Sequence, residues 1–253
     1  MAIRNFGPST LWATREDIAG GTPIKFGSVQ SFTIDHKATT KELQGQGVFA
    51  DAIGRSKISV TGKIAYGAVH AAVFSDLFFG TSLSTGQLTT ANAEGAVVPA
   101  VAPYTYAVAN AATFFSDKGV SYAATGVPMQ QVPAAPTVGQ YMVNSANGTY
   151  TFAAADEGQA ILVSYLYSIA GTGQQISIMQ TPQGIQPVFE IVNERLYQGQ
   201  TGIEKCVYRL PCCVADDLSS PTKQGDFSIT DLGWAAFAGP NGLVEQISFN
   251  RVT

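Results

Sequence analysis

The residues that could do acid–base chemistry are few and lie apart in the sequence. The chain has two histidines, His36 and His70, and neither belongs to a GxSxG or HExxH pattern. His36 follows an expected strand and His70 lies beside the apolar stripe of an expected helix, so we interpret both as packed or surface histidines. No pair of residues has the spacing of a nucleophile and its base. The sequence therefore predicts no catalytic residue and a protein that is not an enzyme.

Metal-binding chemistry has equally little support. The three cysteines, Cys206, Cys212 and Cys213, have no second CxxC and no nearby histidine, so we expect reduced, partly buried thiols and no zinc. The glycine pairs lack the lysine and the strand–loop–helix context that hold phosphate. Four aspartates match no EF-hand spacing, and we interpret them as solvated turn carboxylates: Asp216, Asp217, Asp226 and Asp231. We expect no metal and no cofactor.

Composition narrows the fold and the class of partner. Among 253 residues there are 26 glycines and 12 prolines, and only 13% of residues are charged, which is typical of short strands and tight turns. A net charge of -4 argues against a protein that grips nucleic acid through its phosphates. No signal-peptide pattern and no run of 18 apolar residues is present, so we expect a soluble protein that is not secreted by that route. The expected class is all-β.

Residues 37–80 contain three elements in close succession. Residues 57–65 alternate between apolar and polar side chains, which predicts a half-buried strand. Residues 68–79 carry Val69, Val73 and Leu77 at helical spacing, and Gly80 is the expected end of that helix. Residues 43–55 hold apolar side chains among glycines, so we interpret them as a long, mobile loop that needs a partner surface.

The chain divides by composition into three parts. Residues 86–170 hold one basic residue, Lys118, and short β-rich runs separated by turn sequences, which predicts a small sandwich. Charged residues return after residue 170, with further strands expected at 176–179, 188–193, 203–210, 226–229, 233–238 and 244–250. The simplest organisation is a discontinuous β-domain, 1–85 and 171–253, interrupted by an inserted β-module, 86–170, whose ends lie close together.

Apolar side chains on glycine-punctuated segments are the one positive functional feature. They are Phe6, Trp12, Phe26, Phe49 and Ile53. They either fold back on their own domain or are donated to neighbouring copies, as in a subunit of an ordered assembly. Tyrosines of the inserted module are either core residues or a surface for adhesion to a cell-surface glycan: Tyr104, Tyr106, Tyr122, Tyr150, Tyr165 and Tyr167.

Two stretches carry a resemblance to a known family. KELQGQGVFADAIGRSKISVTGKIAYGAVHAAVFSDLFFG and QGDFSITDLGWAAFAGPNGLVEQISFN resemble the major tail tube proteins of long-tailed, non-contractile (siphovirus-type) bacteriophages. The similarity lies in a KEL loop, the strand that follows it, a helix that ends in FFG and a closing pair of strands. GVSYAATG and GTYTFAAADEGQAILVSYLYS resemble a small Ig-like module inserted in some phage structural proteins.

The resemblance implies a β-sandwich with one helix, assembled as hexameric rings that stack into a hollow tube. The implied partners are further copies of the chain and the tape measure and tail-end proteins, while DNA passes through the lumen without specific binding. The implied location is the virion, after assembly in the bacterial cytoplasm, with the inserted module on the tube exterior. By analogy, inter-subunit contacts come from a loop, Lys41, Glu42, Leu43, Phe49, Ala50, Asp51 and Arg55, and from an N-terminal arm, residues 1–12 with Phe6 and Trp12. Alternatives are a tail terminator, a capsid decoration protein or a carbohydrate-binding β-sandwich.

Overall fold

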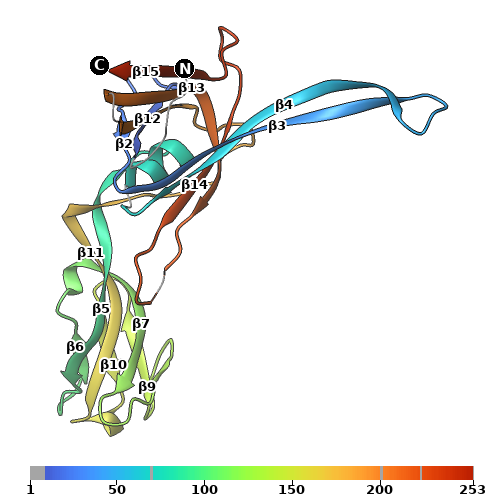
Figure 1. The fold of residues 1–253 in the computed structure, drawn as a ribbon. Coiled ribbons are helices and arrows are strands. Elements are labelled where there is room, and N and C mark those ends of the chain that lie inside the picture. The colour runs from blue at the N-terminus through green and yellow to red at the C-terminus, as the bar shows by residue number, and fades with distance from the viewer. Residues whose placement is uncertain (1–8, 69–70, 200–201, 223, 253) are drawn as a thin grey trace. The chain divides into compact units, whose positions relative to one another are not determined.

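The chain folds into two compact units in a computed structural model that describes residues 9–68, 71–199, 202–222 and 224–252. Unit 1 comprises residues 1–83 and 176–253, and unit 2 comprises residues 84–175. The sequence analysis places these boundaries at 85/86 and 170/171. The protein is predominantly β, as expected, with one short helix and two 3-10 turns (Figure 1).

Unit 1 contains a single eight-stranded sheet. Its strand order is β2-β1-β12-β13-β14-β4-β3, and β15 also pairs with β13. The strands are β1 Ser9–Arg15, β2 Ile24–Lys25, β3 Val29–Gln44, β4 Ala50–Tyr66, β12 Phe189–Gly199, β13 Gly202–Ser219, β14 Thr230–Ala236 and β15 Gln246–Val252. All of the pairs are antiparallel. Segments from both ends of the sequence therefore build one sheet.

The sheet bends at strand β13. Its partner on one side is β12, whereas on the other side β15 pairs with its first half and β14 with its second half. Strands β12, β1 and β2 form one half of the sheet, strands β14, β4 and β3 form the other, and the two halves enclose one apolar core. This core includes Leu11 and Ile191 from the first half and Ile64 and Trp234 from the second. The β-sandwich that the sequence predicts is thus one folded sheet in this unit, because the 18-residue β13 belongs to both layers.

The helix η1, Val73–Phe79, packs its buried side chains Val73 and Leu77 into this core. Its turns are of the wider π type, and Gly80 ends it in the left-handed conformation at φ 64°. Glycine adopts that conformation without steric cost. The expected helix at 68–79 is therefore present in its described part, and Val69 and His70 lie outside the described residues.

Unit 2 is a small β-sandwich. One sheet has the order β5-β11-β7 and the other β6-β10-β9-β8. The strands are β5 Ser84–Val97, β6 Thr105–Ala107, β7 Phe114–Tyr122, β8 Gln130–Gln131, β9 Gln140–Asn144, β10 Thr149–Phe152 and β11 Ala160–Gln175, and the 3-10 turns are η2 Ala111–Thr113 and η3 Ala154–Asp156. Gln175 pairs with Ser84, so the two ends of the unit lie side by side, as an insertion requires.

Three expectations about elements are wrong. Residues 176–179 and 226–229 form no strand, and their apolar side chains are largely exposed. The expected loop at 43–55 is mostly strand: β3 continues to Gln44, β4 begins at Ala50, and only residues 45–49 turn. The expected N-terminal arm is, from Ser9 onward, strand β1 of the sheet.

Among the described residues no helix is long and apolar enough to cross a membrane.

Candidate assembly surface

Strands β3 and β4 extend beyond the sheet as a two-stranded arm (Figure 1). Strand β14 pairs with β4 only from Val60 to Tyr66, so residues 37–44 and 50–59 pair only with each other. At about 3.4 Å per residue, ten residues of β4 beyond Val60 extend roughly 30 Å. An isolated hairpin is marginally stable in water because neither face is covered. This arm therefore has the properties of an element that packs against another molecule.

The two faces of the arm differ in chemistry. Strand β3 is regular from Ser31 to Gln44, so its even-numbered residues share the core face with Phe32, and its odd-numbered residues lie on the outer face. Ile53 pairs with Glu42 and Ile58 pairs with Ala38, which places both isoleucines on the continuation of the core face. Apolar side chains thus continue outward along a face that is buried nearer the sheet.

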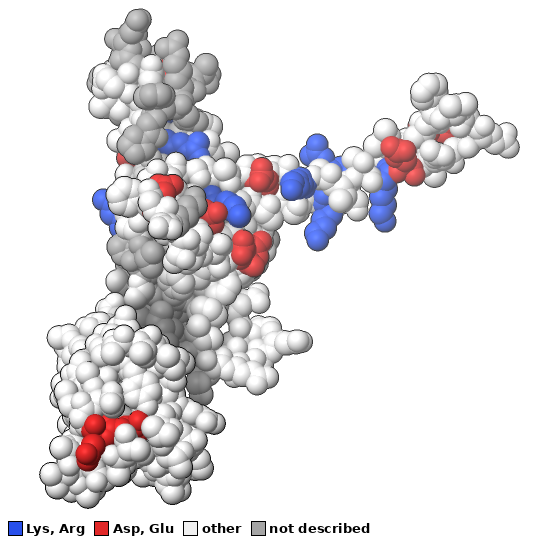
Figure 2. Space-filling model, turned by 90° about the horizontal axis from the view of Figure 1, so that it is seen from below, with Lys and Arg blue, Asp and Glu red and all other residues white. Residues whose placement is uncertain are grey.

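The end of the arm exposes large apolar side chains. Val48 is 94% and Phe49 is 86% exposed, and Leu43, Ile53 and Ile58 are each more than half exposed. Clustered exposure of this kind is typical of interaction sites. Ile58 pairs with Ala38 near the base of the arm, and charged side chains lie along the arm between the sheet and its tip, as Figure 2 shows.

The structure places every predicted loop residue on this arm. Lys41, Glu42 and Leu43 end β3, Phe49 lies in the turn, and Ala50, Asp51 and Arg55 belong to β4. Asp51 is the extra residue of a β-bulge, and its carboxylate lies where a side chain on Gly45 would stand. A second irregularity adds Ser56 between Arg55 and Lys57. These two bulges break the period-two pattern, which is why the sequence resembles a loop there. The exposed Val48 lies in the segment 43–55 that the sequence predicts to need a partner surface, whereas Ile58, expected within a half-buried strand, is 57% exposed.

Of the two predicted N-terminal contact residues, the structure describes Trp12. Phe6 lies outside the described residues. Trp12 is in β1, between Val192 of β12 and Lys25 of β2, and the Lys25 ammonium lies 6.0 Å from the centre of its ring. Trp12 is therefore part of the sheet in a half-buried position. Phe26, also expected on a flexible segment, is buried in the core against Tyr66.

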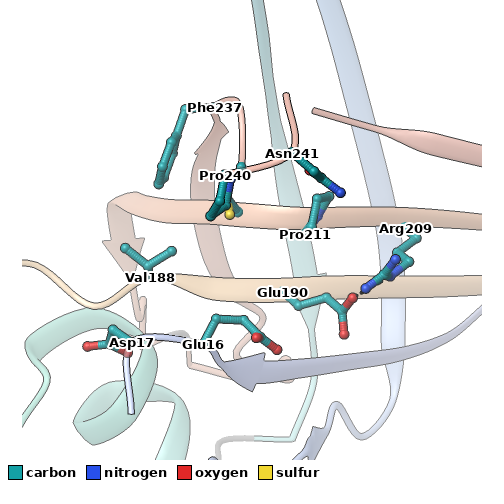
Figure 3. A pocket seen from close by; sticks show the side chains of 11 residues that line it. Glu16, Asp17, Val188, Glu190, Arg209, Pro211, Phe237, Pro240 and Asn241 are labelled. Carbon is teal, nitrogen blue, oxygen red and sulfur yellow. Dashed lines mark hydrogen bonds and ion pairs between the residues drawn. The ribbon is translucent and has the colours of Figure 1, made fainter. Parts of the chain in front are cut away.

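A hollow of about 580 Å³ lies beside the end of β1, the start of β12 and the middle of β13 (Figure 3). Val188, Pro211, Phe237 and Pro240 supply its apolar lining, and Glu190 accepts a hydrogen bond from Arg209 at 2.5 Å. The Arg209–Glu190 ion pair thus lies beside an apolar surface. Such a hollow suits the binding of an apolar group better than catalysis.

Asp17, at the rim of this hollow, is already paired with a basic side chain. Asp17 accepts two hydrogen bonds from the Arg15 guanidinium, at 2.8 and 2.5 Å, and this contact holds the pKa of Asp17 below its ordinary value. The described residues contain no group of three or more His, Cys, Asp or Glu placed to hold a metal ion. His36 contacts Glu245 at 2.5 Å between Nε2 and Oε2, at the base of the arm.

The polar interior of unit 2 is a set of tyrosine–carboxylate contacts. Glu94 accepts hydrogen bonds from Tyr106 and Tyr165, each at 2.6 Å, and from the amide of Ala109 at 3.0 Å. Burial alone would raise the pKa of Glu94, but these three hydrogen bonds outweigh it and lower the pKa below its ordinary value. Burial, with the Glu94 contact, raises the pKa of Tyr106 to about 12.

Further tyrosines repeat this pattern. Tyr122 donates to Asp156 at 2.6 Å, and burial with this contact raises the pKa of Tyr122 to about 12. Tyr150 and Tyr165 are fully buried, so for these two residues the structure favours the alternative of core residues over that of an adhesion surface. Their rings are core, and their hydroxyls are held by carboxylates.

Comparison with known proteins gives no family for this chain. No family model matches it, and a search of curated proteins returned no match.

Proposed function

We propose that this chain is a structural protein that assembles with copies of itself, and that the assembly is the tail tube of a non-contractile bacteriophage. The observation that carries self-assembly is the β3–β4 arm, which continues the core face of the sheet and leaves Ile53 and Ile58 of that face more than half exposed. The tube itself rests on the resemblance of residues 41–80 and 224–250 to tail tube proteins.

The energy available at the arm is sufficient for association. Full burial of a Val, Leu, Ile or Phe side chain stabilises by about 1.5–3 kcal/mol. Five such side chains lie on the arm: Leu43, Val48, Phe49, Ile53 and Ile58. Their burial would contribute roughly 8–15 kcal/mol, which is comparable to the cost of association of about 4–15 kcal/mol. A single arm therefore binds weakly, and repeated contacts in a ring or stack give a stable assembly.

In this role the protein needs neither catalysis nor a cofactor. Hexameric rings stack into a conduit, the tape measure and tail-end proteins contact its lumen and ends, and DNA passes without being held. The low content of basic residues supports the last point, because each neutralised phosphate would add affinity. The virion is the place of action and the host cytoplasm the place of assembly.

Negative-stain electron microscopy and light scattering of the purified chain over a concentration series test this proposal. We expect hollow tubes or stacked sixfold rings. Single rings that never stack would favour a tail terminator or a capsid decoration protein instead. A monomer at every concentration that binds glycans would favour the carbohydrate-binding alternative.

The variant Phe49→Asp tests the arm. A carboxylate at a position that must be buried between copies opposes association, whereas Phe49 contacts little in its own chain at 86% exposure. We expect a folded monomer with an unchanged unfolding midpoint that no longer forms tubes. The matched control is Phe115→Asp, which removes a phenylalanine of unit 2 that is also more than half exposed. Tubes of normal length from Phe49→Asp would contradict the assignment of the arm.

A further inference from the structure

The outer face of the arm carries a row of basic side chains. Lys37 pairs with Ser59, Lys57 pairs with Thr39, and Lys41 pairs with Gly54, so each successive outer-face pair contributes one lysine. No acidic residue belongs to these three pairs. Figure 2 shows the basic side chains gathered along the arm. We call Lys37, Lys41 and Lys57 the basic strip.

The same face carries the opposite charge where the arm joins the sheet. Asp35 is on β3, Asp217 pairs with Gly233 beside Lys63, and Asp231 pairs with Ala65. Asp216, Asp217 and Asp35 surround a hollow of about 430 Å³, which exists because Gly233 has no side chain: a Cβ there would lie 2.5 Å from Asp216 Oδ1. We call Asp35, Asp216, Asp217 and Asp231 the acidic patch.

The acidic patch is incompletely neutralised within the chain. Lys63 Nζ lies 3.9 Å from carboxylate oxygens of both Asp217 and Asp231, and Lys37 is two residues from Asp35 on the same face of β3. The four carboxylates thus outnumber the basic side chains beside them. All four aspartates lie at the surface or partly exposed, and they can accept further cationic partners.

The two charged surfaces lie on the same face of the sheet and are similar in length. The acidic patch runs across the strands, with Asp35 on β3, Asp231 on β14 and Asp217 on β13, which is three strand spacings of roughly 4.8 Å, or about 14 Å. The basic strip runs along the strands from Lys37 to Lys41, which is about 13 Å at roughly 3.4 Å per residue. Because the arm extends away from the sheet, Lys41 lies six residues of β3, roughly 20 Å, beyond Asp35 and cannot reach the patch of its own chain.

From this match we propose that the basic strip of one copy docks on the acidic patch of a second copy. This inference rests on the proposed self-assembly and names the surface and the charges that set its register. The contact is heterologous, since each copy presents both the strip and the patch, and repetition of such a contact generates rings or filaments. The uncovered apolar face of the arm stays available for another contact.

Reciprocal charge reversal of the full-length chain tests the proposal. The variants are Lys41→Glu/Lys57→Glu on the strip and Asp217→Lys/Asp231→Lys on the patch, and light scattering measures the concentration at which half of the protein is assembled. At 0.1 M NaCl we expect each variant to raise that concentration by about tenfold or more, which corresponds to ~1.4 kcal/mol. An equimolar mixture of the two variants should assemble like the original chain, because the acidic strip of one fits the basic patch of the other.

Two controls separate this contact from other effects of charge. Lys25→Glu/Lys118→Glu makes the same change in net charge away from both surfaces and should assemble normally. Raising NaCl from 0.1 to 1 M shortens the Debye length from about 10 to about 3 Å and should weaken assembly of the original chain but not rescue either variant.

The outcomes are distinct for the two proposals. If the original chain forms tubes and the reversed variants form them equally well, the docking inference is wrong and the proposed function stands. Failure of the mixture to assemble, when each variant alone is monomeric, also overturns the docking. Salt-dependent binding of fluorescent duplex DNA that Lys41→Glu/Lys57→Glu abolishes, with assembly unchanged, would assign the strip to a polyanion instead. A chain that is monomeric at every concentration overturns both proposals.

Discussion

Removal of the Asp117 carboxylate should destabilise unit 2 and leave unit 1 unchanged. Asp117 Oδ2 accepts a hydrogen bond from Tyr141 at 2.6 Å, and Oδ1 accepts one from Tyr150 at 2.7 Å. A third comes from the amide of Gly119 at 3.0 Å. Both tyrosine side chains belong to the buried core of the unit, so removal of the carboxylate leaves their hydroxyls without this acceptor.

The expected loss of stability in Asp117→Ala follows from the two tyrosine hydroxyls that lose their acceptor. Leaving a buried donor without a partner costs about 1–3 kcal/mol, so Asp117→Ala should lower the free energy of unfolding of unit 2 by about 2–6 kcal/mol. That is a large part of the 5–15 kcal/mol typical of a whole domain. With an m-value of about 1–3 kcal/mol per molar urea, we expect the midpoint to fall by roughly 1–3 M.

The distribution of aromatic residues supplies the assay. Both tryptophans, Trp12 and Trp234, lie in unit 1, whereas most of the tyrosines lie in unit 2. Urea unfolding is followed by tryptophan fluorescence for unit 1 and by near-ultraviolet circular dichroism of tyrosine for unit 2, at a concentration where light scattering shows a monomer. Only the tyrosine transition should move in Asp117→Ala.

A compensating variant isolates the cause. Tyr141→Phe/Tyr150→Phe removes the two donors, so adding Asp117→Ala to it should cost much less than in the original chain. An Asp117→Ala midpoint within experimental error of the original would refute the reasoning. So would an equal cost of Asp117→Ala in the presence and absence of the hydroxyls, because the carboxylate would then act through something other than these hydrogen bonds.

Two further predictions concern acid stability and close packing. The pKa of Glu94 is lower in the folded than in the unfolded chain, so its stabilising contribution is present above the unfolded pKa and is lost as pH falls through the folded pKa. The urea concentration at the unfolding midpoint of unit 2 should therefore decrease when the pH is lowered below about 4.5. The variant Glu94→Gln should weaken this pH dependence. Gly62→Ala would place a Cβ 2.1 Å from the Thr33 carbonyl oxygen and 2.4 Å from the Trp234 ring, so the free energy of unfolding of unit 1, followed by tryptophan fluorescence, should decrease by about 2–3 kcal/mol. In the control Gly54→Ala the new Cβ has nothing within 4 Å, and the free energy of unfolding should change little. Equal unfolding midpoints for the two variants would contradict this prediction.

Local patterns in the sequence located the elements whose signals are complete within a few residues. Strands β9, Gln140–Asn144, and β10, Thr149–Phe152, are two of the short β-rich runs expected within residues 86–170, and an ANG turn separates them. The helix end at Gly80 is likewise a local signal, since a left-handed residue there favours glycine. The boundaries of the inserted unit differ from the structure by a few residues, because β5 and β11 continue through polar sequence that has no apolar alternation.

The arm shows where local reading fails. Its strands contain two bulges, at Asp51 and Ser56, so the alternation that marks a strand is lost although the pairing continues. Trp12 shows the opposite error. The sequence predicts it on a free N-terminal arm, whereas in the structure it pairs with Val192 on one side and Lys25 on the other. Strand pairing between distant segments has no local signal that identifies it.

The sequence by itself determined the β-rich class, the short helix with its glycine end and a run of apolar side chains at residues 43–55 that calls for a partner. Only the tertiary structure decided that these side chains lie on a paired arm, and that the lysines of this arm share a face with Asp217 and Asp231 from strands far along the chain. The physical reason is that period and composition act over a few residues, whereas a face of a sheet is built by registers between strands that the chain brings together only on folding.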